Sequence, residues 1–487
     1  MLSTRLSALL CLALAAGSPA FAEPVLIEKV TVVSPERETP LRDAFVLLDE
    51  GRIHSVGAER PPVPKNVRVV NGQGRFLVPG LIDSHVHLGL VPGAGIVTAD
   101  VEKRHGELLA AYWKQAPRSY LYHGVTAVVD LAAWSGSTDR FRSAPQGPDF
   151  ITCAPLVQSD GYPAAFLPPE VRGRLLEYTI PADPEAAARL VQRAQKDGHR
   201  CIKIFFAGPL PAEPVVSAIR AESRRLGMPL AIHANSLGMQ AAALRYQPDT
   251  LAHGLWNWDA HDGAPDLPEP IRKHLDAVLA SGVAIQPTFG VMDGLANLFD
   301  PAFLDGPDLK KAVPAELLAW YRTDEAQAFK KELIAETPRL ADPAFARAAF
   351  GEGASQSERA ASYLAQRGGR LLLASDTPSG STWTDQPGLN TWRELQHLAR
   401  TGVSPRDLLK AGTIRNAEVF GLKDLGTVEP GKAANLLLLG SDPLASVEAW
   451  NDIESVILRG EVIPRESLAA GRETPPAPSG SSASPPR

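Results

Sequence analysis

The feature that most constrains the fold is a set of eight short apolar runs between residues 81 and 377. Each run is bounded by Gly, Pro or Asp, and longer Ala-rich stretches with helical spacing separate most of them. This alternation is typical of βα units around a parallel sheet, and eight such units close a barrel. We therefore predict an α/β fold whose main domain is a (β/α)8 TIM barrel. The runs cover residues 81–87, 124–132, 149–157, 201–206, 229–234, 250–254, 283–289 and 371–377.

The segments on either side of the barrel have a different rhythm. Residues 23–78 and 421–465 alternate short β-rich runs with turn signals, which predicts strands. Because such a module stands at both ends, we expect the two segments to pair into one small β-sandwich domain. The barrel domain then spans residues 79–420, with a helical insertion at about 290–368 that we expect to cover the barrel mouth as a lid.

Both ends of the chain are expected to lie outside these domains. Residues 1–22 contain Arg5, an apolar stretch too short to span a bilayer, and Ala-Phe-Ala directly before Glu23. This pattern is typical of a secretory signal peptide, so we expect a mature protein that begins at Glu23 and is periplasmic or secreted. Residues 466–487 are rich in Pro and Ser and are predicted to form a disordered tail.

Charge and composition narrow the partners. The net charge is −6, and the charged residues are interspersed without a basic run. These features argue against a nucleic acid or an anionic membrane surface as a partner. No segment after the signal peptide is apolar enough to span a membrane, so we expect no membrane association after cleavage. We expect a small-molecule substrate, and the sequence is compatible with a homo-oligomer.

Two cysteines remain after removal of the signal peptide. Cys153 and Cys201 each lie inside an apolar run. Two cysteines cannot form a disulfide framework for a chain of this length. We therefore favour two buried thiols on core strands, with one disulfide between neighbouring strands as the alternative.

Residues that can bind metal stand at the C-terminal ends of the barrel runs, the face at which barrel active sites form. His85 and His87 are spaced i, i+2 on a strand, so they project to one side and can share an ion. Lys203 lies in an apolar run, where an unpaired ammonium is costly and becomes a neutral, reactive amine; a lysine paired with a carboxylate is the alternative. Asp376, at the end of another apolar run, needs a cation or a proton. The set is completed by His233 and His253.

These motifs resemble the amidohydrolase superfamily, and within it the imidazolonepropionase-like and Xaa-Pro or Xaa-Arg dipeptidase-like group. The resemblance covers residues 25–463 and rests on VPGLIDSHVH, IKI, AIHA, AHG, SDT and NAEVFGLKDLGTVEPGKAANLLLL. It implies two divalent metal ions, and ligands of nitrogen and oxygen lead us to expect Zn²⁺. Carried over by position, His85, His87 and Asp376 bind one ion, His233 and His253 bind the other, and carboxylated Lys203 bridges both.

The resemblance also implies the reaction. A hydroxide between the ions attacks a peptide-like or N-acyl amino acid bond, with Asp376 as general base and then general acid and Lys203 as the second catalytic residue. A cyclic amide or lactone hydrolase, including an imidazolonepropionase-like enzyme, would use the same site and is the alternative. Deamination is less favoured because Ser236 stands where related deaminases carry a glutamate. Intact ligands argue against a non-catalytic binding protein.

Two departures from the dipeptidase pattern bear on the substrate. Tyr162 stands near the place where such relatives usually have a histidine that contacts the substrate carbonyl. The sequence FFAGP replaces the usual glycine-rich continuation after the lysine, so Phe205 or Phe206 narrows the mouth. The candidate substrate-binding residues are Tyr162, Trp256 and Arg322, with a solvated helix face as the alternative for Arg322.

Overall fold

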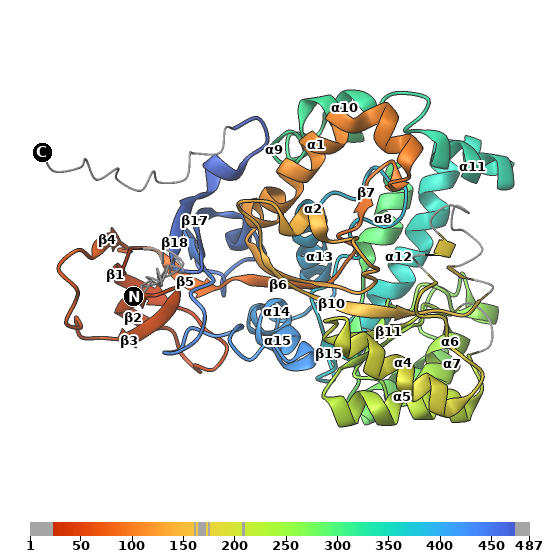
Figure 1. Cartoon of the computed structure of the whole chain (residues 1–487), viewed down its shortest axis with the longest axis horizontal. Helices are drawn as coiled ribbons and strands as arrows, with labels where there is room; N and C mark the ends of the chain where they lie inside the picture. The colour runs from red at the N-terminus through yellow and green to blue at the C-terminus, as the bar shows by residue number, and fades with distance from the viewer. Residues whose placement is uncertain (1–22, 160–161, 164–171, 174–175, 207–209, 473–487) are drawn as a thin grey trace, which may run out of the picture.

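The computed structural model describes residues 23–159, 162–163, 172–173, 176–206 and 210–472. Two eight-stranded sheets organise these residues, and Figure 1 shows them next to each other along the long axis of the molecule. The predicted signal peptide lies outside the described residues.

The larger unit is built on a parallel sheet whose strands follow one another in sequence order. Each of the first seven predicted runs contains one strand, the eighth run shares only Leu371 with β15, and each neighbouring pair of strands is parallel. The strands are β6 (Leu81–Val86), β9 (Val125–Asp130), β10 (Asp149–Leu156), β11 (Cys201–Ile204), β12 (Leu230–His233), β13 (Thr250–Ala252), β14 (Ala284–Gln286) and β15 (Arg370–Leu371).

Backbone hydrogen bonds between the first and last strands close this sheet. The Ser84 amide donates to the Leu373 carbonyl over 3.1 Å, and the Asp376 amide donates to the His85 carbonyl over 2.7 Å. A parallel bridge also joins Val86 to Thr377. The predicted α/β fold with a TIM-like barrel of eight parallel strands is therefore confirmed, although β15 itself is only two residues long.

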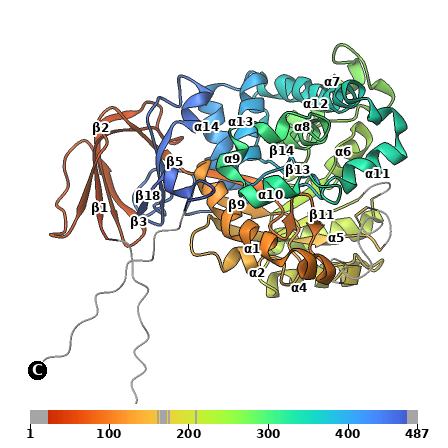
Figure 2. The ribbon, with the colours of Figure 1, turned by 90° about the horizontal axis from the view of Figure 1, so that it is seen from above.

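Helices surround the strands on the outside of the barrel (Figure 2). Side-chain caps fix several of their starts; for example, Asp183 accepts a hydrogen bond from the Ala186 amide. No helix among the described residues is both long and apolar enough to cross a membrane. The barrel helices are α1 (Ala99–Tyr122), α2 (Asp139–Arg142), α4 (Pro184–Lys196), α5 (Glu213–Leu226), α6 (Leu237–Leu244), α7 (Glu269–Ser281), α13 (Leu389–Arg400), α14 (Pro405–Gly412) and α15 (Ile414–Phe420).

A buried cluster lies below the predicted site. Cys201 of β11 and Ala231 of β12 belong to it together with the larger Phe420 of α15. Because side chains alternate along a strand, Lys203 and His233, each two residues farther along, point to the same interior side. The core thus supports the side chains of the predicted site from below.

An insertion between β14 and β15 is helical, as predicted for residues 290–368; its role as a lid stays a prediction. Trp320 at the end of α10 lies against the chain that follows β6, since a Cβ at Gly93 would lie 2.8 Å from its ring. The ring of His105 on α1 lies 5.6 Å from the same indole. The insertion contains α8 (Phe289–Asn297), α9 (Leu309–Ala312), α10 (Ala315–Trp320), α11 (Ala328–Glu336) and α12 (Pro343–Ala365).

The second sheet combines strands from both ends of the chain. Its link is the antiparallel pair of β16 and β5, in which Leu438 is the partner of Leu77. The two segments therefore share one sheet as expected, whereas their arrangement as a two-layered sandwich stays a prediction. The strands are β1 (Val25–Val32), β2 (Leu41–Asp49), β3 (Arg52–Gly57), β4 (Arg68–Asn71), β5 (Phe76–Pro79), β16 (Leu436–Leu439), β17 (Ile453–Leu458) and β18 (Glu461–Pro464), and a separate hairpin joins β7 (Leu90–Val91) to β8 (Gly95–Ile96).

The tail begins later than predicted. Residues Arg465–Leu468 form a short 3-10 helix, and Leu468 is fully buried. The Gln115 side chain donates a hydrogen bond to the Leu468 carbonyl over 3.0 Å. The predicted boundary at residue 466 is therefore wrong, because one leucine anchors the segment on α1. Residues 473–487 lie outside the described residues.

Cys153 and Cys201 form a disulfide, so the favoured interpretation of two free thiols is wrong. The two residues are register partners on the neighbouring strands β10 and β11, and both are fully buried. The barrel register places them opposite each other, which the spacing of 48 residues in the chain does not reveal.

Removing this bridge should destabilise the protein. The Cys153→Ala/Cys201→Ala variant should lose about 4 kcal/mol of unfolding free energy, because the bridge closes a loop of 48 residues. Chemical unfolding measures the loss, and the single Cys153→Ala variant should lose nearly as much. Alkylation in denaturant without reductant should label no cysteine of the chain that begins at Glu23. Two labels would contradict the disulfide.

Candidate metal centre

The predicted metal ligands of the first site converge at the C-terminal ends of β6 and β15. The ligand atoms of His85, His87 and Asp376 all lie within 4.8 Å of one another. The Nε2 atoms of His85 and His87 lie 3.1 and 2.8 Å from Asp376 Oδ1. His85 is buried and His87 is partly buried. The closure of the barrel brings these two strands together and thereby assembles the cluster.

Two further histidines stand beside this cluster. The Nδ1 atom of His253 lies 3.7 Å from Asp376 Oδ2, and the ring centroids of His253 and His233 are 4.5 Å apart. His253 and Asp376 have φ values of +95° and +55°. Residues other than glycine hold such left-handed conformations at a cost of about 1–3 kcal/mol, and they do so most often at functional sites. The strained turns aim both side chains at the centre.

Lys203 lies on the same interior side of the barrel and is fully buried. Its Nζ atom has no hydrogen-bond partner and no carboxylate ion pair among the described residues, which disfavours the paired alternative. Burial lowers the pKa of Lys203 to about 7, although Asp376 opposes the shift. The Nζ atom lies 4.9 Å from the centroid of Phe205, so this ring narrows the space beside the amine as expected.

The protonation states suit metal ligands. Burial lowers the pKa of His85 and of His233 to about 3 and that of His253 well below its usual value, so all three imidazoles are neutral. Burial opposes ionisation of Asp376, but His85 and His87 hold its pKa well below the usual range. Neutral imidazoles and an ionised carboxylate are the forms that bind divalent cations.

Unpartnered atoms in the centre indicate that it is built to hold an additional group. The Nδ1 atoms of His85 and His233 and the Nζ atom of Lys203 are buried without a hydrogen-bond partner among the described residues. Each such atom costs about 1–3 kcal/mol. Divalent metal ions fit this donor set, which combines imidazole nitrogen with carboxylate oxygen.

Two of the three candidate substrate-binding residues lie at this centre. The ring of Tyr162 lies 5.0 Å from that of His233, and the ring of Trp256 lies 4.7 Å from that of His253. Arg322, in contrast, pairs with Asp305 over 2.8 Å, and half of its side chain is exposed. No contact joins Arg322 to the described residues of the centre, in agreement with the solvated-face alternative.

Asp83 was not among the predicted residues, yet it holds the centre together. This fully buried carboxylate accepts hydrogen bonds from the Ser375 hydroxyl at 2.6 Å, the Thr391 hydroxyl at 2.5 Å and the His85 amide at 3.2 Å. It thereby joins β6, the segment that follows β15, and α13. Burial raises its pKa to about 6. The sequence contained one indication of this role, because Asp83 is a carboxylate inside the apolar run that ends in HVH.

Replacing Asp83 by alanine should weaken metal binding about 10–100-fold, the usual effect of removing a group that orients metal ligands. The Asp83→Asn variant keeps one acceptor and should lose less. Thr391→Val removes only one of the hydrogen bonds and is the matched control. Competition with a metal chelator measures the affinity. Wild-type affinity in the alanine variant would contradict this role.

Comparison with known proteins agrees with the geometry. Residues 76–463 match the family described as "Amidohydrolase family". An imidazolonepropionase from Aromatoleum aromaticum is 28% identical over 255 residues, which are 45% of this chain and 60% of that protein, so less than two thirds of the relative's length is matched.

Two solved structures share the fold. Phenylurea hydrolase B has a TM-score of 0.65 at 19% identity, with coverage of 92% of this chain and 98% of that one. A Xaa-Pro dipeptidase with bound methionine in the active site has a TM-score of 0.63 at 17% identity, with coverage of 91% and 100%. Since the family match spans most of the sequence and includes every strand of the barrel, this chain belongs to the amidohydrolase family.

Proposed function

We propose that the protein is an exported metal-dependent hydrolase that cleaves a carbon–nitrogen amide bond, either peptide-like or in an N-acyl amino acid. The observation that carries this proposal is the convergence of His85, His87 and Asp376 within 4.8 Å, beside the unpartnered amine of Lys203. Such a cluster at the C-terminal face of a barrel is the arrangement expected of a hydrolytic metal site.

His85, His87 and Asp376 would hold one divalent ion, His233 and His253 would hold a second, and carboxylated Lys203 would bridge them. We expect both ions to be Zn²⁺. When bound, the ions polarise the substrate carbonyl and make a water molecule acidic enough to react near neutral pH.

Asp376 would move the proton. Its Oδ1 faces His85 and His87 and its Oδ2 faces His253, so the carboxylate lies between the two halves of the centre. As the water oxygen forms its bond to the carbonyl carbon, Asp376 accepts the water proton. It then gives this proton to the amide nitrogen as the carbon–nitrogen bond breaks, which releases a carboxylic acid and an amine.

Tyr162 would orient the carbonyl. Burial raises the pKa of its hydroxyl above the usual value, so the group stays protonated and can donate a hydrogen bond. Its ring lies 5.0 Å from that of His233 and 6.0 Å from that of Phe205, which in turn lie 6.1 Å from each other. The phenol would thus serve where dipeptidase relatives use a histidine.

A cyclic amide hydrolase is the second candidate, with lactones as related substrates. The similarity to the imidazolonepropionase of Aromatoleum aromaticum over 255 residues favours it. Deamination is disfavoured, because Ser236 caps α6 by accepting a hydrogen bond from the Met239 amide at 3.3 Å and offers no acid–base group.

Chelation and substrate screening test the proposal. The metal-loaded protein should release an amine from dipeptides or N-acyl amino acids, lose this activity after treatment with a chelator, and regain it with Zn²⁺. Ring opening alone would favour the second candidate. Release of ammonia alone, or turnover that survives complete metal removal, would contradict the proposal.

Export rests on the signal-like residues 1–22 and on the buried Cys153–Cys201 disulfide, since such bridges form in oxidising compartments. N-terminal sequencing of protein from the extracytoplasmic fraction should begin at Glu23. An intact Met1 would overturn this part of the proposal.

A further inference from the structure

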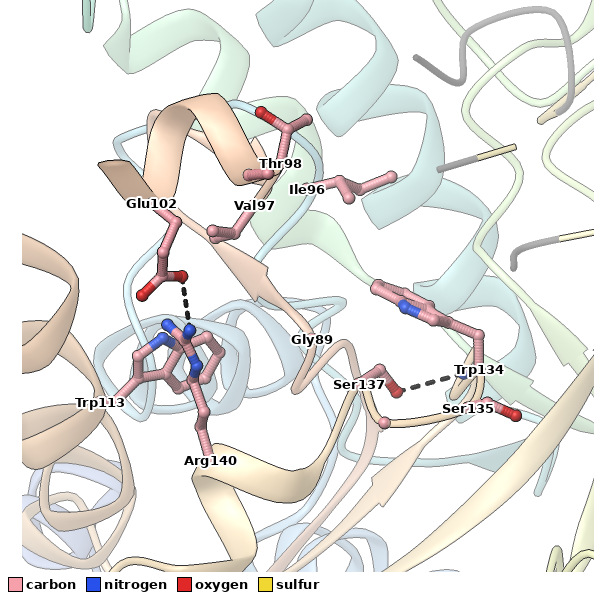
Figure 3. A pocket seen from close by; sticks show the side chains of 12 residues that line it. Gly89, Ile96, Val97, Thr98, Glu102, Trp113, Trp134, Ser135, Ser137 and Arg140 are labelled. Atoms are coloured by element: carbon pink, nitrogen blue, oxygen red, sulfur yellow. Dashed lines mark hydrogen bonds and ion pairs between the residues drawn. The ribbon is translucent and has the colours of Figure 1, made fainter. Parts of the chain in front are cut away.

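A cavity of about 470 Å³ lies between the chain that follows β6, helix α1 as far as Trp113, and the loop after β9 with the start of α2. Its walls include the apolar side chains of Ile96, Val97, Trp113 and Trp134. Figure 3 shows Trp134 on one side and Trp113 on the other, with Gly89 between them. We call this cavity the Trp134 pocket. Its volume is within the range of 300–1,000 Å³ that is typical of sites for small molecules.

One lining residue of the pocket, Gly89, lies close to the metal ligand His87 in the chain. Gly89 is two residues after His87, so their Cα atoms are at most about 7 Å apart. A Cβ at Gly89 would lie 2.7 Å from the Trp134 ring and 2.8 Å from Ser137 Cβ. The glycine therefore allows the loop after β9 to pack directly on the chain that carries His87. Both loops follow strand C-termini, the face at which barrel sites form.

The charged and hydroxyl-bearing side chains named below are already partnered, whereas the buried indole Nε1 of Trp113 has no hydrogen-bond partner among the described residues. Arg140 forms an ion pair with Glu102, and Figure 3 shows this pair across the pocket from Trp134. The Ser135 hydroxyl donates to Glu177 over 2.8 Å, and the Ser137 hydroxyl accepts from the Trp134 amide over 3.1 Å. A charged substituent would therefore find no unpaired counter-ion among the described lining residues, whereas an apolar one would lose no hydrogen bond.

Aromatic rings lie beside the Lys203 and His233 side of the centre. Phe205 lies 4.9 Å from the Lys203 amine, and Tyr162 lies 5.0 Å from the His233 ring. The Trp134 pocket begins at Gly89, on the His87 side, where it offers space for a substituent of a substrate bound at the ligands.

We propose that the Trp134 pocket is a specificity site that receives an aromatic or large branched apolar substituent of the amide substrate. This inference rests on the proposed function and deepens it, because it names the substrate class. Burial of a phenyl or leucyl side chain between two tryptophans should favour that substrate over its methyl analogue by about 10–100-fold in kcat/KM.

Two substrate pairs test the preference on both sides of the scissile bond. N-acetyl-L-phenylalanine is compared with N-acetyl-L-alanine, and N-phenylacetylglycine with N-acetylglycine. The wild-type, metal-loaded protein should prefer the aromatic member of one pair by about 10–100-fold. Equal kcat/KM values within both pairs would overturn the inference while the proposed function stands.

Variants of lining residues test whether the preference for aromatic substrates arises in the Trp134 pocket. Ala99 lines the pocket and is exposed at the start of α1, so Ala99→Trp fills the pocket without disturbing the core. This variant should lower kcat/KM for the aromatic substrate at least about tenfold and leave the small one within about threefold. Trp134→Ala should likewise erode the preference. Ala344→Trp, exposed in the first turn of α12, is the matched control and should behave as wild type.

A binding assay keeps the inference separate from catalysis. If the wild type hydrolyses none of the four substrates, calorimetry with N-acetyl-L-phenylalaninamide still tests the pocket. Binding that is lost in Ala99→Trp and kept in Ala344→Trp would support the inference and leave the reaction to be reassigned. Equal binding by all three proteins, or no binding by the wild type, would overturn it.

Discussion

Replacing Asp376 by asparagine should lower kcat for amide hydrolysis at least about 1,000-fold while the fold stays intact. The carboxylate is ionised, contacts His85 and His87 at 3.1 and 2.8 Å, and is the group proposed to carry the proton. Asparagine keeps the shape but accepts no proton, and general acid–base catalysis alone contributes about 10²–10⁴-fold. Steady-state kinetics at saturating Zn²⁺ measure the loss.

The control for this variant is Asp249→Asn. Asp249 lies before β13 and pairs with Arg220 at the opposite end of the barrel, where substitutions affect stability rather than chemistry. Its kcat should stay within about threefold of wild type. If Asp376→Asn retained more than about a tenth of wild-type turnover, Asp376 would not be the proton carrier.

Replacing Lys203 by methionine should separate stability from activity. The lysine amine is buried without a partner, so a methionine of similar length should raise the unfolding free energy of the metal-free protein by about 1–2 kcal/mol. The same variant lacks the proposed bridging group and should lose hydrolysis by at least about 100-fold together with tight binding of the proposed second ion. Lys273→Met, on the exposed face of α7, is the control.

A carbon-13 NMR experiment tests directly for the proposed carbamate on Lys203. Protein equilibrated with labelled bicarbonate and Zn²⁺ should show a carbamate signal that the Lys203→Met variant lacks. An unmodified lysine in the metal-loaded wild type, or a metal-free methionine variant that is less stable than wild type, would contradict the assigned role.

The barrel was predictable because most of its strands, such as β6, β11 and β12, are buried on both faces and therefore appear as apolar runs. The common direction of the His85 and His87 side chains was also predictable, since alternate residues of a strand point to the same side. His253 and Asp376 adopt left-handed backbone conformations after their strands. The alternation of side chains along a strand therefore could not predict the direction of these two side chains. Their positions at the C-terminal ends of barrel runs, together with the order of the motifs, suggested that they meet.

Other features depended on information that the chain order does not carry. The Cys153–Cys201 bridge depends on the register between β10 and β11, which barrel geometry decides. Asp83 also lies in an apolar run, but the run alone does not show that its carboxylate accepts hydrogen bonds from Ser375 and Thr391. The walls of the Trp134 pocket come from separate loops, so its volume exists only after folding.

Quantitative metal analysis tests the binuclear centre most directly. After equilibration with Zn²⁺ and removal of unbound metal, the wild-type protein should contain two ions per chain, and His233→Ala should contain one. Asp249→Asn, which leaves the ligands unchanged, should contain two. A wild-type content of one ion or none, or two ions retained in His233→Ala, would contradict a centre held by the histidines, Lys203 and Asp376.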